Sequence, residues 1–400
     1  MRRFVPTVLL VCVLISLASP AGARSAWKRR IDRYTSGRSI SVALMDGKEM
    51  LYQHFSSTRR VPASGQKLLL SLALLDVVES GLRINTFASA TSVDAGVVRG
   101  NLWLLGRGDP TVTGGGRYGK ELPFRPTRLG VLAKKIAAAG ITKIRGSVMG
   151  ATSYFVRDWW ATGWKSDFPS KEVPIPTALS FEGNRRDGRH IADPEKRAAT
   201  NLTKRLRDEG VVVRKAPGAG TPPSGLNSIA GVSSVPLEAM MRFMNRRSSN
   251  FFAEMFGKRL AVETGRSGSI AHGADTIEAW AAKRSVDVDA YDASGLSYSN
   301  RVSPKGFVRL LEYAEEQPWW ATLRSTLAGA DQGTLEDRLR GVKLRAKTGT
   351  LTAVSSLTGW VWLTETKSWA AFSIMDSGMY KATAAPIEDK IVREIYRNAR

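Results

Sequence analysis

A run of apolar residues at helical spacing follows a Ser-Gly-Gln-Lys sequence near the start of the chain. Pro62 precedes this run, so a helix is predicted to begin close to Ser64. The apolar positions are Leu68, Leu69, Leu72, Leu75 and Val78. Ser64 and Lys67 are three residues apart, which places them on one face of the helix, about one turn from each other. The lysine amine can therefore reach the serine hydroxyl.

Alternating apolar and polar residues predict strands near both ends of the chain. Ile40–Leu44 alternates in this way, and the dipeptide Asp46-Gly47 predicts a hairpin to a second strand at Met50–Tyr52. Three further strand-like stretches follow one another between residues 342 and 375, and apolar residues four apart then mark a final helix. These elements predict an α/β (α+β) fold with an antiparallel sheet, against which the Ser64 helix packs.

The middle of the chain, residues 89–221, has a different pattern. Short apolar runs alternate there with turn-rich stretches, and two stretches have helical spacing. A Pro- and Gly-rich segment at 216–223 reads as a linker. We therefore expect an inserted mixed α/β domain at 89–221, and a discontinuous domain formed by 24–88 and 222–400.

The first 23 residues read as a secretory signal peptide. Arg2 and Arg3 precede the apolar stretch Val8–Leu17, and Ala21-Gly22-Ala23 reads as a small-residue cleavage site. The apolar stretch is too short for a comfortable membrane-spanning helix. We therefore expect an exported protein.

Few residues suited to thiol or metal chemistry would remain in the exported chain. The one cysteine, Cys12, lies in the predicted signal peptide, which leaves no disulfide and no cysteine-based metal site. The three histidines, His54, His190 and His272, form no HExxH pattern, and no GxSxG sequence is present. We expect neither a metal nor another cofactor.

The chain is strongly basic, with a formal net charge of +23. Without Arg2 and Arg3, 57 basic residues stand against 36 acidic ones, a net charge of +21. An exported protein with this charge is expected to be attracted to anionic surfaces such as wall polymers or membrane headgroups. No nucleic acid is expected as a partner, because no zinc finger, aromatic RNA-binding signature or long basic arm is present.

Taken alone, a serine and a lysine at a helix start are more often a helix cap and a solvated charge. A serine hydroxyl needs an adjacent base, and Lys67 could serve only if burial or a second cation lowered its pKa from about 10.4. Two later motifs could supply the partners. Ser248 and Asn250 lie at a predicted junction between two helices, and Lys347 lies in a strand-like Lys-Thr-Gly-Thr sequence.

The three motifs SxxK, SxN and KTG, in this order, resemble the signature set of the penicillin-recognising serine enzymes. Further stretches make the chain similar to the class C low-molecular-mass penicillin-binding proteins, which are D-alanyl-D-alanine carboxypeptidases and endopeptidases. These stretches are 100–106, 108–111, 292–297, 300–303 and 346–350. The resemblance covers nearly the whole mature chain. It implies a β-lactamase/transpeptidase-like core with helices on both sides of the sheet, and a periplasmic or wall-associated location.

The resemblance implies a peptidase of peptidoglycan stem peptides that β-lactams inhibit. Ser64 would attack the carbonyl between two D-alanines, or between D-alanine and the cross-linking residue, and form an acyl-enzyme. Lys67 would take the serine proton, Ser248 would relay a proton towards the leaving group, and Asn250 would hold the substrate amide.

The same resemblance assigns substrate binding to the KTG strand. Lys347 and Thr348 would bind the terminal carboxylate, and Gly349 would let the substrate approach the strand edge. The backbone N–H groups of Ser64 and Thr350 would hold the oxyanion, a contribution of about 3 kcal/mol per donor. A positive charge on Lys347 would also depress the pKa of Lys67.

The chain departs from the family in length. Enzymes of this type usually carry two nested domains between the first two motifs, and the 184 residues from Ser64 to Ser248 are few for both. The shortening falls between Phe181 and Asp193, where the inner domain would begin. We therefore expect that inner domain to be missing and the active site to be more open to bulky cross-linked wall.

Two other functions remain as alternatives. A β-lactamase has the same core and motifs, but the ExxxN pattern of the deacylating glutamate occurs here only at Glu394–Asn398, after the KTG motif. A non-catalytic, basic wall-binding scaffold would have no need to keep Ser64, Lys67 and Lys347 intact. Both alternatives are weaker than the peptidase.

Overall fold

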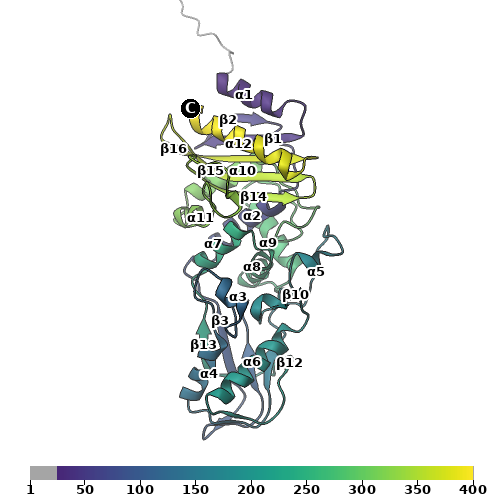
Figure 1. Cartoon of the computed structure of the whole chain (residues 1–400), viewed down its shortest axis with the longest axis vertical. Helices are drawn as coiled ribbons and strands as arrows, with labels where there is room; N and C mark the ends of the chain where they lie inside the picture. The colour runs from purple at the N-terminus through teal and green to yellow at the C-terminus, as the bar shows by residue number, and fades with distance from the viewer. Residues whose placement is uncertain (1–24, 400) are drawn as a thin grey trace, which may run out of the picture.

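A computed structural model describes residues 25–399 of the chain, so the predicted signal peptide lies outside the described residues. The molecule is elongated, with a five-stranded sheet towards each end and a layer of helices between them (Figure 1). We refer to the end that carries residues 26–35 and 381–398 as the first unit and to the opposite end as the second unit. No helix in the described part of the chain is long and apolar enough to span a membrane.

The first unit is built on a five-stranded antiparallel sheet with the strand order β14-β15-β16-β1-β2. Its strands are β1 (Ile40–Asp46), β2 (Glu49–His54), β14 (Leu344–Leu351), β15 (Val354–Leu363) and β16 (Ser368–Ser377). The early hairpin and the three late strands, predicted separately, therefore form one sheet, in which β1 pairs with β16.

Helices cover both faces of this sheet, as expected for the fold class. On one face α1 (Ala26–Thr35) and α12 (Lys381–Asn398) pack against each other, and α12 packs on β15. On the other face α10 (Pro304–Glu315) packs on β1 and β16. Each face encloses its own apolar core.

The helical layer surrounds α2 (Gln66–Val77), the helix predicted to follow Ser64. Its neighbours are α7 (Leu237–Arg247), α8 (Asn250–Glu263), α9 (Ile270–Ala282) and α11 (Trp320–Thr326). Every residue of α2 from Gln66 to Leu75 is buried. A helix that is apolar on all sides is stable only inside a core, which explains why this one lies at the centre of the protein.

The second unit contains a five-stranded sheet, β12-β8-β6-β3-β13, and a smaller four-stranded sheet, β11-β7-β5-β4. The strands of the larger sheet are β3 (Asn85–Ala90), β6 (Leu102–Leu105), β8 (Val148–Ala151), β12 (Gly218–Gly220) and β13 (Asn227–Ser233). Those of the smaller sheet are β4 (Val93–Asp94), β5 (Val97–Val98), β7 (Lys143–Ile144) and β11 (Val212–Val213). The helices α4 (Leu129–Ala138) and α6 (Pro194–Asp208) pack against each other, α4 on β13 and α6 on β8 and β12.

The larger sheet of the second unit extends beyond the limits expected for the inserted domain. β3 begins before residue 89, and its antiparallel partner β13 lies after residue 221. Part of the expected linker forms β12, which pairs with β8. These strands are rich in Gly, Ala and Ser, so they lack the apolar alternation by which strands are predicted. We propose that the second unit runs from β3 to β13.

Several short elements complete the fold. They are the 3-10 turns η1 (Ala63–Gly65), η2 (Glu182–Asn184) and η3 (Gly333–Leu335), the helices α3 (Arg117–Glu121) and α5 (Phe168–Lys171), and the strands β9 (Arg185–Arg186) and β10 (Arg189–His190). β9 and β10 form a hairpin with a two-residue loop, Asp187 and Gly188, both of which have positive φ. This hairpin occupies the stretch where the sequence predicted a shortened insertion.

Candidate active site

Ser64 lies in the η1 turn that leads into α2, as the apolar pattern predicted. The preceding residue, Ala63, has a φ of 46°, so the turn is held in a left-handed conformation that residues with a side chain rarely adopt. The Ser64 side chain is only half-buried. It is therefore accessible at the N-terminal end of a helix, where unpaired N–H groups favour negative charge.

The amine of Lys67 is enclosed by three oxygen atoms. It donates to Ser64 Oγ at 2.9 Å, to Asn250 Oδ1 at 2.8 Å and to the backbone carbonyl of Ser294 at 2.5 Å. Lys67 itself is fully buried. The predicted pairing of the first serine with the first lysine is thus present, and Asn250 joins it.

Burial lowers the pKa of Lys67 to about 8. The carboxylates of Asp292, Glu254 and Glu172 oppose this shift because they favour the charged amine. The sequence named two possible causes, burial and a second cation, and it offered Lys347 as that cation. Burial is the cause that the structure shows, and the charge of Lys347 is not among the causes of the shift.

Ser248 and Asn250 lie at the junction of α7 and α8, as predicted. Ser248 ends α7 in a left-handed conformation with a φ of 55°, and Ser249 caps α8 by accepting a hydrogen bond from the Phe252 N–H. Asn250 is the first residue of α8. Its Nδ2 donates to the Glu172 carbonyl at 3.3 Å while its Oδ1 accepts from Lys67, so the amide orientation is fixed at both ends.

Lys347 and Thr348 lie in β14, where the sequence placed them. The Lys347 amine donates to Ser248 Oγ at 3.0 Å and to the Thr348 carbonyl at 2.8 Å. Burial lowers the pKa of Lys347 well below its usual value, and the positive charges of Lys67 and Lys381 lower it further. The Thr348 hydroxyl donates to Thr334 Oγ1 at 2.7 Å, which ties β14 to η3.

Gly349 has a packing role that the resemblance did not suggest. A Cβ atom at this position would collide with Ser356 Oγ and with the Pro62 carbonyl, both inside the protein. The glycine therefore allows β14 to approach the turn that carries Ser64. The next residue, Thr350, is exposed at the end of β14 and pairs with Ser355 of β15.

A loop between α9 and α10 completes the surroundings of Lys67, and sequence reasoning gave it no role. Asp292 is fully buried and accepts hydrogen bonds from the Trp164 indole at 2.7 Å and the Asn300 amide at 2.8 Å. It also accepts from the backbone N–H groups of Gly295 and Ser297. These bonds hold the loop in the shape that directs the Ser294 carbonyl to Lys67.

Glu254 of α8 supports the same loop from a different element. Its Oε1 accepts the backbone N–H groups of Ala293 at 3.2 Å and Ser294 at 2.8 Å. Burial, followed by the negative charge of Asp292, raises the pKa of Glu254 to about 8. Asp292 belongs to a stretch that the resemblance singled out, whereas nothing in the sequence marked Glu254.

The geometry brings together two hydroxyl–amine pairs, Ser64 with Lys67 and Ser248 with Lys347. Asn250 contacts the first pair and Thr348 the second. The Glu394–Asn398 pattern lies apart from them. It belongs to α12, which packs on the face of the sheet opposite to α10, and Asn398 donates to Glu394 within that helix at 2.6 Å. The two hydroxyl–amine pairs are suited to nucleophilic attack by a serine with a lysine as base.

A profile of the D-Ala-D-Ala carboxypeptidase 3 (S13) family matches residues 25–189 and 181–397. The chain belongs to this family. It is therefore a serine peptidase of the D-alanyl-D-alanine carboxypeptidase type, a hydrolase of cell-wall remodelling. The two ranges that match the profile overlap at residues 181–189, which include most of the β9–β10 hairpin.

Curated relatives of this S13 peptidase are similar over most of its length. A D-alanyl-D-alanine carboxypeptidase of Actinomadura sp. is 26% identical, and the match covers 94% of this chain and 86% of the relative. A carboxypeptidase of Mycobacterium tuberculosis is 29% identical over 79% of this chain and 70% of the relative.

A solved structure shares the fold of this S13 peptidase. Penicillin binding protein 4 of Haemophilus influenzae has a TM-score of 0.77 at 19% identity, over 92% of this chain and 99% of that chain. The predatory endopeptidase Bd3459 of Bdellovibrio bacteriovorus has a TM-score of 0.57 at 15% identity, over 90% and 93%. The α/β fold expected from the sequence is thereby confirmed.

Proposed function

We propose that the chain is a D-alanyl-D-alanine carboxypeptidase, a DD-endopeptidase or both, which cleaves peptidoglycan stem peptides through an acyl-enzyme on Ser64. The observation that carries this proposal is the 2.9 Å contact between Ser64 Oγ and the buried amine of Lys67. Family membership supports the substrate class.

The three contacts of Lys67 fit a neutral amine. A neutral amine has two N–H groups and one lone pair. The carbonyl oxygens of Asn250 and Ser294 can only accept hydrogen bonds, so they would take the two N–H groups. The lone pair is then left for the Ser64 hydroxyl. In the reaction Ser64 Oγ bonds to the substrate carbonyl carbon while Lys67 takes its proton.

The second hydroxyl–amine pair supports departure of the leaving group. When the C–N bond breaks, the leaving nitrogen needs a proton, and Ser248 can deliver it. The Lys347 amine, 3.0 Å from Ser248 Oγ, can then replace that proton. Lys347 and Thr348 would also bind the terminal carboxylate of the substrate, which favours the protonated form of Lys347.

The remaining positions assist the same step. Asn250 would hold the substrate amide, and the N–H groups of Ser64 and Thr350 would bind the oxyanion. Water then hydrolyses the acyl-enzyme and releases the shortened peptide. β-Lactams would acylate Ser64 in the same way. A protein of the same fold supports this expectation, since penicillin binding protein 4 of Haemophilus influenzae was solved in complex with a β-lactam.

The place of action follows from the substrate. We propose that the chain is exported, with 1–23 as its signal peptide, and works in the periplasm or at the cell wall. The net charge of +21 would favour contact with anionic wall polymers.

Labelling with a fluorescent penicillin tests the proposal. We expect one label on each chain of the purified protein and none on a Ser64→Ala variant. Mass spectrometry of muropeptides incubated with the protein would then show loss of D-alanine, cleavage of cross-links or both. An unmodified protein that takes no label would overturn the acyl-enzyme proposal.

A further inference from the structure

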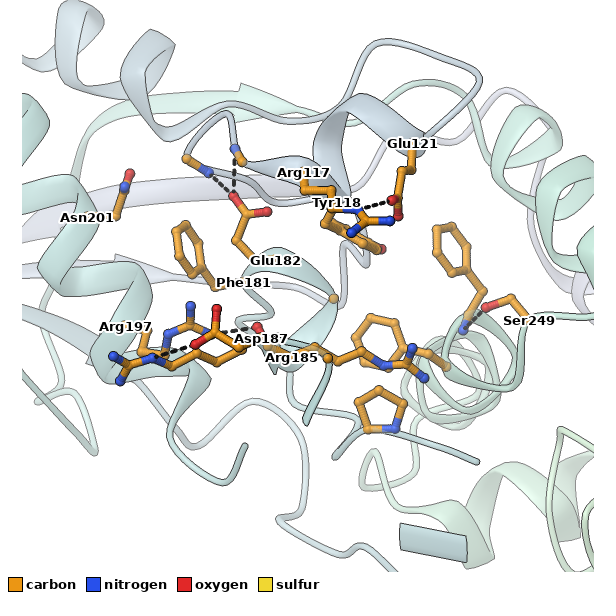
Figure 2. Close-up of a pocket in the computed structure, with 18 of the residues that line it drawn as sticks. Arg117, Tyr118, Glu121, Phe181, Glu182, Arg185, Asp187, Arg197, Asn201 and Ser249 are labelled. Atoms are coloured by element: carbon orange, nitrogen blue, oxygen red, sulfur yellow. Dashed lines mark hydrogen bonds and ion pairs between the residues drawn. The ribbon is translucent and has the colours of Figure 1, made fainter. Parts of the chain in front are cut away.

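A cavity of about 870 Å³ lies between the second unit and the helical layer. Its walls come from α3, from residues 181–188 and from the first turn of α8 (Figure 2). This volume falls within the usual range of ligand sites, about 300–1,000 Å³. The mechanism described above makes no use of this space.

The cavity adjoins the active site through two chain segments. Ser249 lines the cavity, and its neighbours Ser248 and Asn250 belong to the active site. Pro174 also lines it, and Glu172, two residues earlier, accepts a hydrogen bond from Asn250. A ligand in the cavity would therefore lie one residue away from groups that face the reaction.

One part of the wall is aromatic. The rings of Phe181, Phe251 and Phe252 are largely buried in the protein but still line the cavity, together with Phe243 and Tyr118. The Tyr118 hydroxyl donates to the Pro110 carbonyl at 2.7 Å, so only its ring is offered to a ligand. These side chains suit the aliphatic part of a peptide.

Arginines form the polar part of the wall, and most of them already have partners. Arg117 pairs with Glu121 at 2.6 Å, and Arg186 with Asp187 at 3.6 Å. The Arg197 guanidinium donates to a backbone carbonyl of the hairpin at 2.8 Å. These three arginines are therefore engaged within the protein.

Arg185 differs from the other three. Its guanidinium makes no hydrogen bond or ion pair with any residue in 25–399, although its carbonyl accepts from Arg197. Figure 2 shows its side chain extending from the hairpin towards the side where Ser249 caps α8. The carboxylate of Glu182 is directed elsewhere, since its Oε1 accepts from the Thr113 hydroxyl and the Gly114 N–H. A free guanidinium beside an aromatic wall is suited to bidentate binding of a carboxylate on an apolar chain.

We propose that this cavity binds a carboxylate-bearing segment of the wall peptide outside the bond that is cleaved, with Arg185 on the carboxylate and the aromatic rings on the aliphatic chain. The inference rests on the proposed function, which supplies a peptide substrate with free carboxylates. It adds a second subsite, which a large muropeptide can fill and a short D-alanyl-D-alanine peptide cannot.

Binding without cleavage tests the subsite directly. In a Ser64→Ala background, calorimetry would measure the Kd of a purified dimeric muropeptide. We expect Arg185→Gln to raise this Kd about tenfold, as loss of a charged hydrogen-bonded contact implies. Arg189→Gln is the matched control, because Arg189 is exposed on the same hairpin but does not line the cavity. Equal affinities for the two variants would overturn the proposal.

A change in the ligand tests the same contact from the other side. The same dimer with its free carboxylates amidated is expected to bind about tenfold more weakly to the protein with Arg185. In the Arg185→Gln variant, amidation should cause no further loss. If amidation weakens binding equally in both variants, Arg185 does not recognise the carboxylate.

Kinetics on the protein with Ser64 intact separates this inference from the proposed function. Arg185→Gln should raise KM for the dimer but leave unchanged the rate of penicillin labelling and the turnover of an N-blocked tripeptide that ends in D-alanyl-D-alanine. Failure of the unmodified protein to label or cleave would overturn the proposed function. Normal labelling with an unchanged KM for the dimer would overturn only the second subsite.

Discussion

In its neutral form, the buried amine of Lys67 has one partner for each of its two N–H groups and one for its lone pair. The oxygens of Asn250 and Ser294 accept the N–H groups, and Ser64 is the one contact that carries a proton for the base to take. Removing the amine from water lowers its pKa to about 8, so about one tenth of the molecules hold a neutral base at pH 7. An amine at its ordinary pKa would be neutral in fewer than about one molecule in a thousand.

This pKa predicts the pH dependence of acylation. The second-order rate of penicillin labelling should rise about tenfold per pH unit at low pH and become constant above about pH 8, because the neutral form of Lys67 increases as the pH rises. Stopped-flow measurements from pH 6 to 9.5 would show this. A Lys67→Arg variant, whose guanidinium stays protonated, should lose at least about 100-fold in rate at every pH. A flat profile for the unmodified protein would contradict Lys67 as the base.

Glu254 is expected to tune this profile from outside the reacting groups. Glu254→Gln keeps an oxygen that can accept the N–H groups of Ala293 and Ser294, but it removes the negative charge that Glu254 acquires near pH 8, where that charge favours protonated Lys67. The midpoint of the pH profile should therefore move to lower pH, with little change in the plateau rate.

Glu263→Gln provides the control for that measurement, because Glu263 lies on the same helix but pairs with Arg259 near the surface. An unchanged midpoint in Glu254→Gln would show that its charge does not reach Lys67.

Sequence reasoning indicated the candidate residues of the site but not the interactions that set their pKa values. Helical spacing was enough to bring Lys67 to Ser64, and the motif set indicated Ser248, Asn250 and Lys347. Glu254 could not be found in this way, since its role depends on a loop about 40 residues away in the chain. The sequence offered burial and a second cation as causes of a lowered pKa for Lys67 but could not choose between them, because burial follows from the packing of helices that are distant in sequence.

At the scale of the element, two glycines allow two other chain segments to pack closely against the Ser64 turn. Gly349 of β14 lies against Pro62, and Gly295, with a φ of 82°, lies against the Ala63 carbonyl. A side chain at either position would collide with the turn. The position of the nucleophile is therefore set by backbone contacts on both sides of it.

A methyl group at residue 349 should displace this turn. Gly349→Ala is expected to slow penicillin labelling at least tenfold and to lower the free energy of unfolding by about 1–3 kcal/mol, because the methyl collides with Ser356 and Pro62. Rates from labelling and unfolding curves in urea would measure both effects. Gly81→Ala, where nothing lies within 4 Å of the added atom, is the control. Wild-type labelling in Gly349→Ala would contradict the role of this close approach.

Lys258 connects α8 to the segment that follows the second unit's β8. Its buried amine donates to the carbonyls of Val156 and Pro176, both at 2.9 Å, and pairs with Asp158. Lys258→Met should lower the free energy of unfolding by about 3 kcal/mol, since it leaves these groups without their partner. Denaturation in urea measures this, and Lys171→Met, which breaks an exposed pair with Asp167, should change stability by less than about 0.5 kcal/mol. Equal effects of the two substitutions would contradict this role of Lys258.

Strands were predictable from the sequence where apolar residues recur at regular spacing, and they were missed where apolar residues do not recur. The pattern around residues 40–52 and 342–375 predicted every strand of the first sheet, but not that β1 would pair with β16. The predicted limits of the inserted domain, 89 and 221, cut through the larger sheet of the second unit. They were misplaced because β12 and β13 are built largely from Gly, Ala and Ser. Without apolar alternation, such strands are defined only by their partners.

At the scale of the whole molecule, the active site lies in the helical layer where the two units meet. The first unit supplies β14 and its lysine, the layer supplies α2 and the α7–α8 junction, and the segment after β8 supplies Glu172. The hairpin of β9 and β10 adds little bulk on this side. We therefore expect cross-linked wall to reach the site more readily than in a relative with a further domain.

The positive charge of the molecule predicts salt-dependent retention on the wall. The bound fraction of a Ser64→Ala variant on isolated sacculi should fall several-fold between about 20 mM and 500 mM salt, because ions screen attraction to anionic polymers. Pull-down with sacculi and quantitative gels would measure it. Sacculi stripped of their anionic polymers serve as the control and should bind weakly at both salt concentrations. Retention that does not depend on salt would show that charge plays no part.

The pairing of β1 with β16 has a consequence for the order in which the protein folds. A two-stranded hairpin is barely stable alone, so β1 and β2 must wait for a strand that leaves the ribosome more than 300 residues later. The second unit has no such delay, since both of its sheets pair only strands from residues 85–233. β14 also arrives late, and with it the contact that positions the Ser64 turn. A partly synthesised chain would therefore contain its nucleophile long before it could use it.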